Sequence, residues 1–156
     1  MAIFPGFLPV SGYTPEDGKS YCSFFLALTH PFTKGSVHIA SSDPLAQPTI
    51  DHRVLDNEVD LDILVQAIKF SRRLADTDSL NTVITKEVLP GAAVQTDEDI
   101  KSYIRKTIST VFHPIGTAAM LPRNEGGVVD ASLRVYGTSN LRVVSGFRYF
   151  VVPGLT

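Results

Sequence analysis

Cysteine is almost absent from this sequence, and its scarcity excludes two kinds of site. Cys22 is the single cysteine among 156 residues, so one chain cannot form a disulfide framework or a zinc site built from cysteines. Cys22 lies in the apolar run 21–28. Because free cysteine is among the most often buried residue types, we expect a buried thiol rather than a reactive one.

An excess of charge of one sign is also lacking. The chain has 14 Lys and Arg against 16 Asp and Glu, a net charge of −2, and no basic stripe, so no nucleic-acid partner is expected. Hydrophobic residues make up 44% and charged residues 19%, a composition typical of a globular chain. A chain of this length fits one domain that buries roughly 70% of its unfolded surface.

No apolar run reaches the roughly 20 residues that a membrane helix needs. The first 20 residues contain Pro5, Pro9 and Pro15 and lack a basic start followed by an unbroken apolar stretch, so no signal peptide is expected. At face value this predicts a soluble cytoplasmic protein that does not contact a membrane. Secretion stays open if the sequence is a piece of a longer protein.

Several well-known site motifs are missing. The sequence contains no G-x-G-x-x-G, G-x-x-x-x-G-K-[ST] or G-x-S-x-G, which argues against a dinucleotide-binding turn, a P-loop and a nucleophile elbow. The four histidines show no metal-ligand spacing, so no metal site is predicted; they are His30, His38, His52 and His113. A dispersed Ser/His/Asp triad stays open.

The first half of the chain predicts short strands. After an irregular lead-in over residues 1–20, the β-prone stretches 21–29 and 36–40 flank a turn at 30–35, and together they predict a hairpin with a loop of about four to six residues. Residues 41–48 predict a loop, and residues 49–54 a short strand or a turn.

Two amphipathic helices are predicted. The first covers 58–75, with Asp56 or Asn57 as its cap. Its apolar face recurs at helical spacing and comprises Leu61, Leu64, Val65, Ile68 and Ala75. The second covers 97–109 and opens with a near capping box at 96–99. Its apolar face comprises Ile100, Tyr103, Ile104 and Ile108.

The remaining segments complete the expected fold class. Residues 80–90 contain a short β-prone piece, and short β-prone pieces follow residue 110. Regular βαβ alternation is missing, so we expect an α+β fold with a mainly antiparallel sheet of about five or six strands and both helices packed on one face.

One ordered set of motifs is specific. Residues 111–120 read VFHPIGTAAM, and GGVVD, LRVYG and NLRVV follow at 126–130, 133–137 and 140–144. In this order and spacing they resemble the C-terminal signature of the glucose-methanol-choline (GMC) oxidoreductases, with aryl-alcohol-oxidase-, glucose-oxidase- and choline-dehydrogenase-like members. Upstream, the stretch from His30 to Asp51 is similar to the family's substrate-domain hairpin. The resemblance covers roughly 21–145, and we take 21–156 as a GMC C-terminal-like domain.

The resemblance implies an FAD-dependent oxidation of primary or secondary alcohols, in which a hydride passes to the flavin and a histidine takes the hydroxyl proton. That histidine is His113, and an imidazole, with an ordinary pKa of about 6.5, can accept a proton near neutral pH. Pro114 holds His113 in extended conformations. The family resemblance places five residues near the flavin, namely Pro114, Gly116, Thr117, Gly146 and Phe147.

The other singled-out residues have structural interpretations. We expect His30 and His38 to serve the hairpin, His52 to be a solvated loop residue, and Asp130 and Arg134 to fix turns. Three departures from the family weigh against activity of this chain alone. The N-terminal Rossmann region is missing, Gly146 replaces an expected acidic residue, and the sequence stops at or before the second catalytic residue and the closing helix.

Two functional interpretations therefore stay open. The chain is either the substrate-binding domain of a flavin-dependent enzyme, inactive without its flavin domain, or a binding protein that kept the fold and lost the chemistry. In the second case the uncovered flavin-facing surface would bind a ligand or a second copy of the chain, which predicts a homo-oligomer. That surface would include Phe147, Tyr149, Phe150, Val151 and Val152. An independent hydrolase or lectin-like module has no motif in its support.

Overall fold

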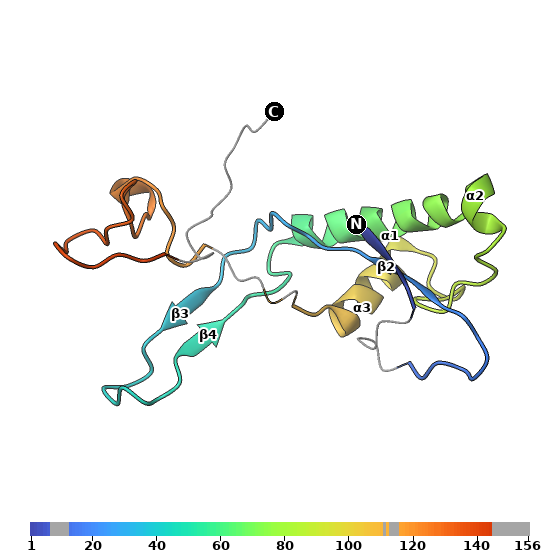
Figure 1. Ribbon diagram of the computed structural model, residues 1–156, viewed down its shortest axis with the longest axis horizontal. Helices are drawn as coiled ribbons and strands as arrows, with labels where there is room; N and C mark the ends of the chain where they lie inside the picture. The colour runs from blue at the N-terminus through green and yellow to red at the C-terminus, as the bar shows by residue number, and fades with distance from the viewer. Residues whose placement is uncertain (7–12, 111, 113–115, 145–156) are drawn as a thin grey trace. The chain divides into compact units, whose positions relative to one another are not determined.

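The structure is a computed structural model that describes residues 1–6, 13–110, 112 and 116–144 (Figure 1). The chain divides into two compact units. The first comprises Met1–Thr33 and Leu55–Ser109, and the second comprises Lys34–Val54 and Thr110–Thr156. Four strands, three α-helices and one short 3₁₀-helix lie in the described residues.

Helix α1 spans Glu58–Ala75, the range that the periodicity predicts. The Asn57 side chain caps it by accepting a hydrogen bond from the Val59 N–H at 2.9 Å, which satisfies one of the free donors of the first turn. Helix α3 spans Asp97–Thr107 and begins with a complete capping box between Thr96 and Asp99. Both predicted helices and their caps are thus confirmed.

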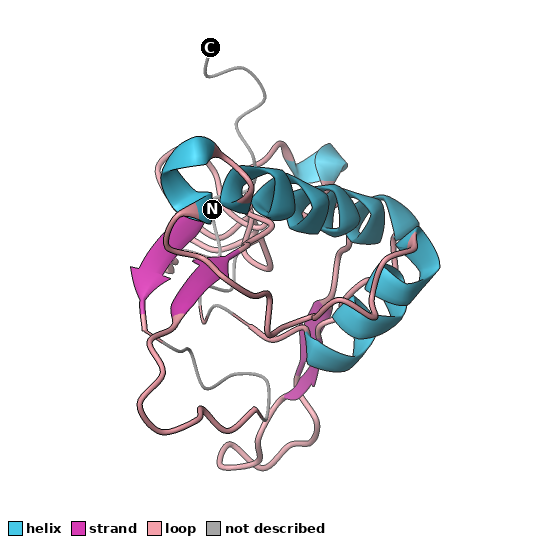
Figure 2. Cartoon of the chain, turned by 90° about the vertical axis from the view of Figure 1, so that its right-hand side faces the viewer, coloured by secondary structure: helices cyan, strands magenta, loops and turns pink. Residues whose placement is uncertain are grey.

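The core of the first unit forms where α1 and α3 pack together (Figure 2). Five buried side chains make up the cluster: Leu61, Val65 and Ile68 from α1, and Ile100 and Ile104 from α3. These are the central members of the two predicted apolar faces. Ile108, which the pattern also placed on the α3 face, is 38% exposed, because it is the C-cap and its ψ of 138° turns the chain out of the helix.

Three ion pairs flank this core and show how the helices run. Glu58 binds Arg105 at 2.9 Å, Asp62 binds Lys101 at 2.8 Å, and Lys69 binds Asp97 at 2.5 Å. Positions rising along α1 meet positions falling along α3, so the two helices are antiparallel. Each exposed pair contributes little alone, but the set opposes a slip of one helix along the other.

Asp60 is a buried carboxylate in the first turn of α1, with 1% of its surface exposed. Its Oδ1 accepts a hydrogen bond from the Phe32 N–H at 2.8 Å, and its Oδ2 accepts one from the Thr33 N–H at 2.9 Å. Burial by itself raises the pKa of Asp60, but the hydrogen bonds from Thr33 and Phe32 outweigh it and hold this pKa below its ordinary value of 3.8.

The strands pair antiparallel, as the fold class requires, but with different partners from those expected. Strand β1 (Ala2–Pro5) pairs with β2 (Cys22–Phe25), and β3 (Ser36–His38) pairs with β4 (Thr49–Asp51). The predicted hairpin between 21–29 and 36–40 is therefore wrong, because Asp60 binds the intervening backbone. Part of the expected irregular lead-in is ordered as β1, and 49–54 contains a strand.

A single sheet of five or six strands does not form within the described residues, where the strands make two separate two-stranded ladders. The β-prone pieces after residue 126 contribute isolated bridges instead, since turns interrupt them every few residues. Cys22 is exposed rather than buried, because it begins a four-residue strand in a two-stranded ladder, where few neighbours can cover it.

The β-prone piece expected at 80–90 is not a strand. The chain forms the short helix α2 (Asp78–Asn81) and then turns. The guanidinium of Arg72 binds both oxygens of Glu87 at 2.9 Å and donates a further hydrogen bond to the Val94 carbonyl at 2.8 Å. These three hydrogen bonds of Arg72 attach the segment to α1, so the segment does not pair with a strand.

Among the described residues, no helix is long and apolar enough to cross a bilayer.

Two isoleucine-to-alanine substitutions, one in this core and one at the surface, test how much the core stabilises the fold. Ile100, with 0% exposure, fills the contact between α1 and α3, whereas Ile39 is 91% exposed. We expect Ile100→Ala to lower the free energy of unfolding by about 2–5 kcal/mol and Ile39→Ala to change it by less than about 0.5 kcal/mol. Urea unfolding followed by circular dichroism measures both, and equal effects would contradict this core.

Asp60 predicts a loss of stability in acid. A carboxyl group whose pKa is lower in the folded state stabilises the fold above its unfolded pKa, and this contribution is lost as the pH falls through the folded pKa. We expect the stability difference between the wild type and Asp60→Asn to be full at pH 7 and to shrink below about pH 3.8. Urea midpoints between pH 7 and pH 2.5 test this, and a constant difference argues against a charged Asp60.

Candidate functional site

The segment that carries the predicted chemistry lies in the second unit. His113, Pro114, Gly146 and Phe147 fall outside the described residues, whereas Gly116 and Thr117 are described. The assignment of His113 as the proton acceptor, and of these residues as flavin contacts, therefore stays a prediction. The structure gives the geometry of the chain that follows them.

Gly116 has a φ of 97°, in the left-handed region that strongly favours glycine. Thr117 is exposed, and two residues further on the chain enters the interior at Ala119, which is 5% exposed. The backbone thus turns at Gly116 and leaves Thr117 at the surface next to a buried anchor. The Thr117 side chain is therefore accessible from solvent, and its contact with the flavin stays a prediction.

The anchor is a small packed scaffold that begins at Ala119. Its carbonyl accepts hydrogen bonds from the Val128 N–H at 2.9 Å and from the Val129 N–H at 3.3 Å. Met120 and Val129 form a parallel bridge, and Val129 has 0% exposure. The GGVVD segment therefore holds the chain that directly follows Gly116 and Thr117.

Gly127 is required here for a steric reason. A Cβ atom at this position would overlap the backbone carbonyl of Leu121. The same carbonyl oxygen accepts a hydrogen bond from the Tyr136 hydroxyl at 3.0 Å, so the Leu121 carbonyl has little freedom to move away. The second glycine of the GGVVD motif thus permits a close approach of two backbone segments.

Asp130 organises the next turn. Its Oδ1 accepts hydrogen bonds from the Ser132 N–H at 2.8 Å and the Arg134 N–H at 3.0 Å, and its Oδ2 binds the Arg134 guanidinium at 3.3 Å. The hydrogen bond from the Arg134 backbone is the main cause that lowers the pKa of Asp130. These bonds confirm the prediction that Asp130 and Arg134 fix a turn.

The two LRV pieces of the signature lie against each other. Arg134 and Arg142 form an antiparallel bridge. The Val135 N–H donates to the Leu141 carbonyl at 3.0 Å, and the Val143 N–H donates to the Leu133 carbonyl at 3.1 Å. The order of the motifs along the chain thus corresponds to a continuous set of hydrogen bonds from Ala119 to Val143.

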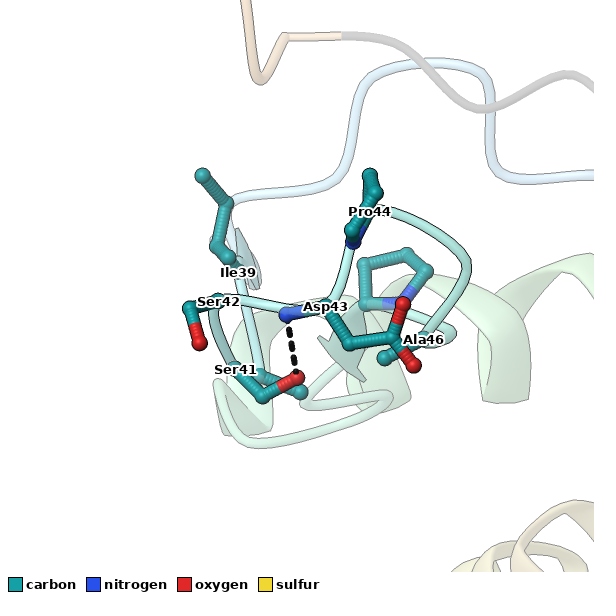
Figure 3. Close-up of a pocket in the computed structure, with 8 residues that line it drawn as sticks. Ile39, Ser41, Ser42, Asp43, Pro44 and Ala46 are labelled. Atoms are coloured by element: carbon teal, nitrogen blue, oxygen red, sulfur yellow. Dashed lines mark hydrogen bonds between the residues drawn. The ribbon is translucent and has the colours of Figure 1, made fainter.

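A hollow of about 440 Å³ lies in the loop that follows β3 (Figure 3). The Ser41 hydroxyl accepts a hydrogen bond from the Asp43 N–H at 3.2 Å, and the Asp43 carboxylate accepts one from the Leu45 N–H at 2.9 Å. These polar groups hold the turns of their own loop, and every residue that lines the hollow is exposed. The predicted loop at 41–48 is confirmed, and its hydrogen bonds are those of a turn.

The structure describes the other three histidines and allows the metal prediction to be compared with their positions. Nδ1 of His30 is hydrogen-bonded to the Thr29 hydroxyl at 3.0 Å, His38 ends β3 opposite Thr49, and His52 is exposed. His38 thus lies at a strand end and His52 at an exposed loop position, as expected, whereas the hairpin that His30 was expected to serve does not form. Among the described residues, no group of three or more metal-ligating side chains comes together.

Sequence reasoning missed two polar centres of the first unit. Asp60 lies in the predicted helix 58–75, but the sequence pattern does not indicate its burial against Phe32 and Thr33. Arg72 lies in the same helix, and the pattern does not indicate its hydrogen bonds to Glu87 and Val94. Both depend on partners more than a dozen residues away, for which a local pattern gives no signal.

The comparisons with known proteins agree with the resemblance. The C-terminal family model described as GMC oxidoreductase matches residues 31–146. A GMC oxidoreductase family protein of Malassezia sympodialis, Mala s 12, is 48% identical over 118 residues, which are 76% of this chain and 19% of that protein.

Two solved structures are similar in fold. A fungal aryl-alcohol oxidase has a TM-score of 0.70 and 42% identity, and the match covers 76% of this chain and 20% of that one. An FAD-dependent oxidoreductase from Chaetomium thermophilum has a TM-score of 0.72 and 33% identity, with 77% and 21% covered. The chain thus spans about a fifth of the length of these proteins.

The scaffold predicts different outcomes at two glycines. We expect Gly127→Ala to open the contact with the Leu121 carbonyl and to speed amide hydrogen exchange at Val128 and Val129. Gly137 differs from Gly127 in having a positive φ of 82°, and nothing lies within 4 Å of a Cβ built there. Because asparagine tolerates this conformation, Gly137→Asn should leave these amides protected. Amide hydrogen exchange measured by NMR tests both expectations. Unchanged protection of Val128 and Val129 in Gly127→Ala would contradict the close approach of Gly127 to the Leu121 carbonyl.

Proposed function

The chain belongs to the GMC oxidoreductase family, and from this premise we propose that it is the substrate-binding domain of an FAD-dependent alcohol oxidoreductase. The observation that carries the proposal is the ordered signature, which lies within the family match over 31–146. In the described part of that signature, buried Ala119 and Val129 anchor the chain directly after the HPIGT segment. The packing of Ala119 and Val129, as well as the sequence of the signature, thus supports the proposal.

His113 is the proposed proton acceptor. It would take the hydroxyl proton of a bound alcohol on a ring nitrogen, and its ordinary pKa of about 6.5 lets it be neutral and receptive near pH 7. Pro114 restricts the backbone at His113, and the turn at Gly116 begins two residues later. A base that is followed directly by a proline and then by a held turn would lose little freedom when substrate binds, which favours proton transfer.

FAD would accept the hydride that leaves the alcohol carbon when the cofactor is bound. The starts of the three described α-helices are unfavourable places for its pyrophosphate. All three α-helices carry acidic residues in the first turn, Glu58 and Asp60 in α1, Asp78 in α2, and Asp97 to Asp99 in α3. A phosphate group prefers a helix N-terminus without carboxylates. We therefore propose that this chain contributes flavin contacts and the base, whereas the flavin is held elsewhere.

The five proposed flavin contacts fit that division. Gly116, which is half-buried with a left-handed backbone, permits a close approach of a planar ring, and Thr117 next to it offers an exposed hydroxyl. Pro114, Gly146 and Phe147 complete the proposed set. The substrate is a small primary or secondary alcohol, and the 42% identical aryl-alcohol oxidase makes a benzylic alcohol the first one to test.

A non-catalytic binding role is the second candidate. It is favoured by the roles of the described signature residues, since Val129, Gly127 and Asp130 each hold the fold. In that case the family fold would serve to bind a ligand or a second copy of the chain. The two candidates differ in one respect that can be measured, which is flavin reduction in the presence of a flavin-binding partner.

The experiment compares two protein preparations. The 156-residue chain alone is titrated with FAD, and no binding is expected. The matched 118 residues of the Malassezia sympodialis relative are then exchanged for those of this chain, and reduction of the flavin by benzyl alcohol is followed by absorbance. Retained reduction is expected, and His113→Ala should slow it about 100- to 10,000-fold, the usual contribution of a general base.

His52→Ala is the matched control, because it removes the same side chain from an exposed loop position and should leave the rate unchanged. The hybrid must first show the absorbance of bound flavin. A hybrid that binds flavin and is not reduced by alcohols favours the non-catalytic candidate. Reduction that is insensitive to His113→Ala would assign the base to another residue.

A further inference from the structure

Residues 34–54, called the arm from here on, leave the first unit after Thr33 and return to it at Leu55. None of these residues is buried, and within the arm β3 and β4 pair over three residues each. A two-stranded ladder of this length has little stability of its own. The arm shares the second compact unit with residues 110–156, and the residues that hold its two ends together lie in the first unit.

The first end is held by Asp60. Its two carboxylate oxygens accept the backbone N–H groups of Phe32 and Thr33, at 2.8 and 2.9 Å, on the two residues before the arm. A carboxylate that is 1% exposed and satisfied by two backbone donors is a strong, directional contact. It fixes the chain at the point where the arm starts.

The second end is joined to the first through Thr33. Its hydroxyl oxygen accepts a hydrogen bond from the Asn57 N–H at 3.1 Å, and Asn57 is the cap of α1, two residues after the arm returns at Leu55. Thr33 thus binds Asp60 through its backbone N–H and Asn57 through its hydroxyl oxygen, and a hydrogen bond from its side chain also lowers the pKa of Asp60. Both ends of the arm meet at one polar cluster at the start of α1.

The returning end also has an unfavourable backbone. Arg53 has a φ of 46° and Leu55 a φ of 62°, both in the left-handed region that side chains avoid. Asp51 supports this turn by accepting hydrogen bonds from the Arg53 N–H at 3.1 Å and from its guanidinium at 3.3 Å. Such residues persist where surrounding contacts over-determine the conformation.

We infer that Asp60 is a clamp that closes the root of the arm, so that losing its carboxylate lets the two ends of residues 34–54 separate while α1 and α3 stay packed. The helix pair has its own contacts. Its apolar cluster does not include Asp60, and its three ion pairs use other side chains. Opening of the arm is thus separable from unfolding of the helices, as in a local unfolding unit.

Asparagine is the informative replacement at Asp60. An amide has a similar shape but a single acceptor oxygen, so its NH₂ group would face the N–H of Phe32 or Thr33. One buried donor would then be unpaired. Asp62→Asn is the matched control, because it makes the same change two residues further along α1, where the side chain binds Lys101 at 2.8 Å and is 59% exposed.

Limited digestion with trypsin tests the clamp on the full chain, with fragments identified by mass spectrometry. Trypsin sites lie at both ends of the arm, at Lys34 and Arg53, and reference sites lie in α3, at Lys101 and Arg105. In Asp60→Asn we expect cleavage at the arm sites to be about tenfold faster, as loss of a buried hydrogen bond implies, and this acceleration should exceed any acceleration at the α3 sites. Asp62→Asn should not speed cleavage at the arm sites.

Thr33→Val provides a second test that keeps the Asp60 carboxylate. It removes the acceptor for the Asn57 N–H and should speed cleavage at Lys34 and Arg53 by a smaller factor. Equal acceleration at the arm and α3 sites in both variants would mean that Asp60 and Thr33 stabilise the first unit as a whole, and would overturn the inference. Arm cleavage unchanged in both folded variants would overturn it as well.

Discussion

The packing of α1 against α3 is the contact on which the other features of the first unit depend. Leu61, Val65 and Ile100 lose nearly all their exposure there, and burial of apolar surface is the main favourable term in folding. The antiparallel ion pairs then favour one register. Once α1 is held, its first turn becomes a fixed point to which distant parts of the chain can attach, and Asp60 and Asn57 use it in this way.

The helices could be predicted because their signals are local. The spacing of Leu61, Val65 and Ile68 and the caps Asn57 and Thr96 lie within the elements that they define. Strand pairing has no such signal. The edge of β2 goes to residues 2–5 and not to 36–40, because Asp60, 28 residues beyond Phe32, binds the segment that would have formed the hairpin turn. The sequence does not show whether an aspartate is buried or solvated, because its burial depends on the fold.

The candidate site shows a similar division. The order of HPIGT, GGVVD and the two LRV pieces identified the family, and the turn role of Asp130 followed from its position between β-prone pieces. The reason for Gly127 could not be predicted, since it lies in the approach of its backbone to the Leu121 carbonyl. The chemistry of His113 rests on the motif, because that residue lies outside the described part of the chain.

The described signature residues act mainly as a scaffold, and this separates family membership from activity. Val129 is buried, Gly127 permits a backbone contact and Asp130 closes a turn, and each of these roles would be needed in a domain that had lost its chemistry. Catalysis would additionally need a base and a flavin held in place. The acidic first turns of α1 and α3 are unfavourable for a phosphate group. The same scaffold therefore fits an active domain when a flavin is supplied and a binding domain when it is not, so the supply of flavin, more than the fold, decides between them.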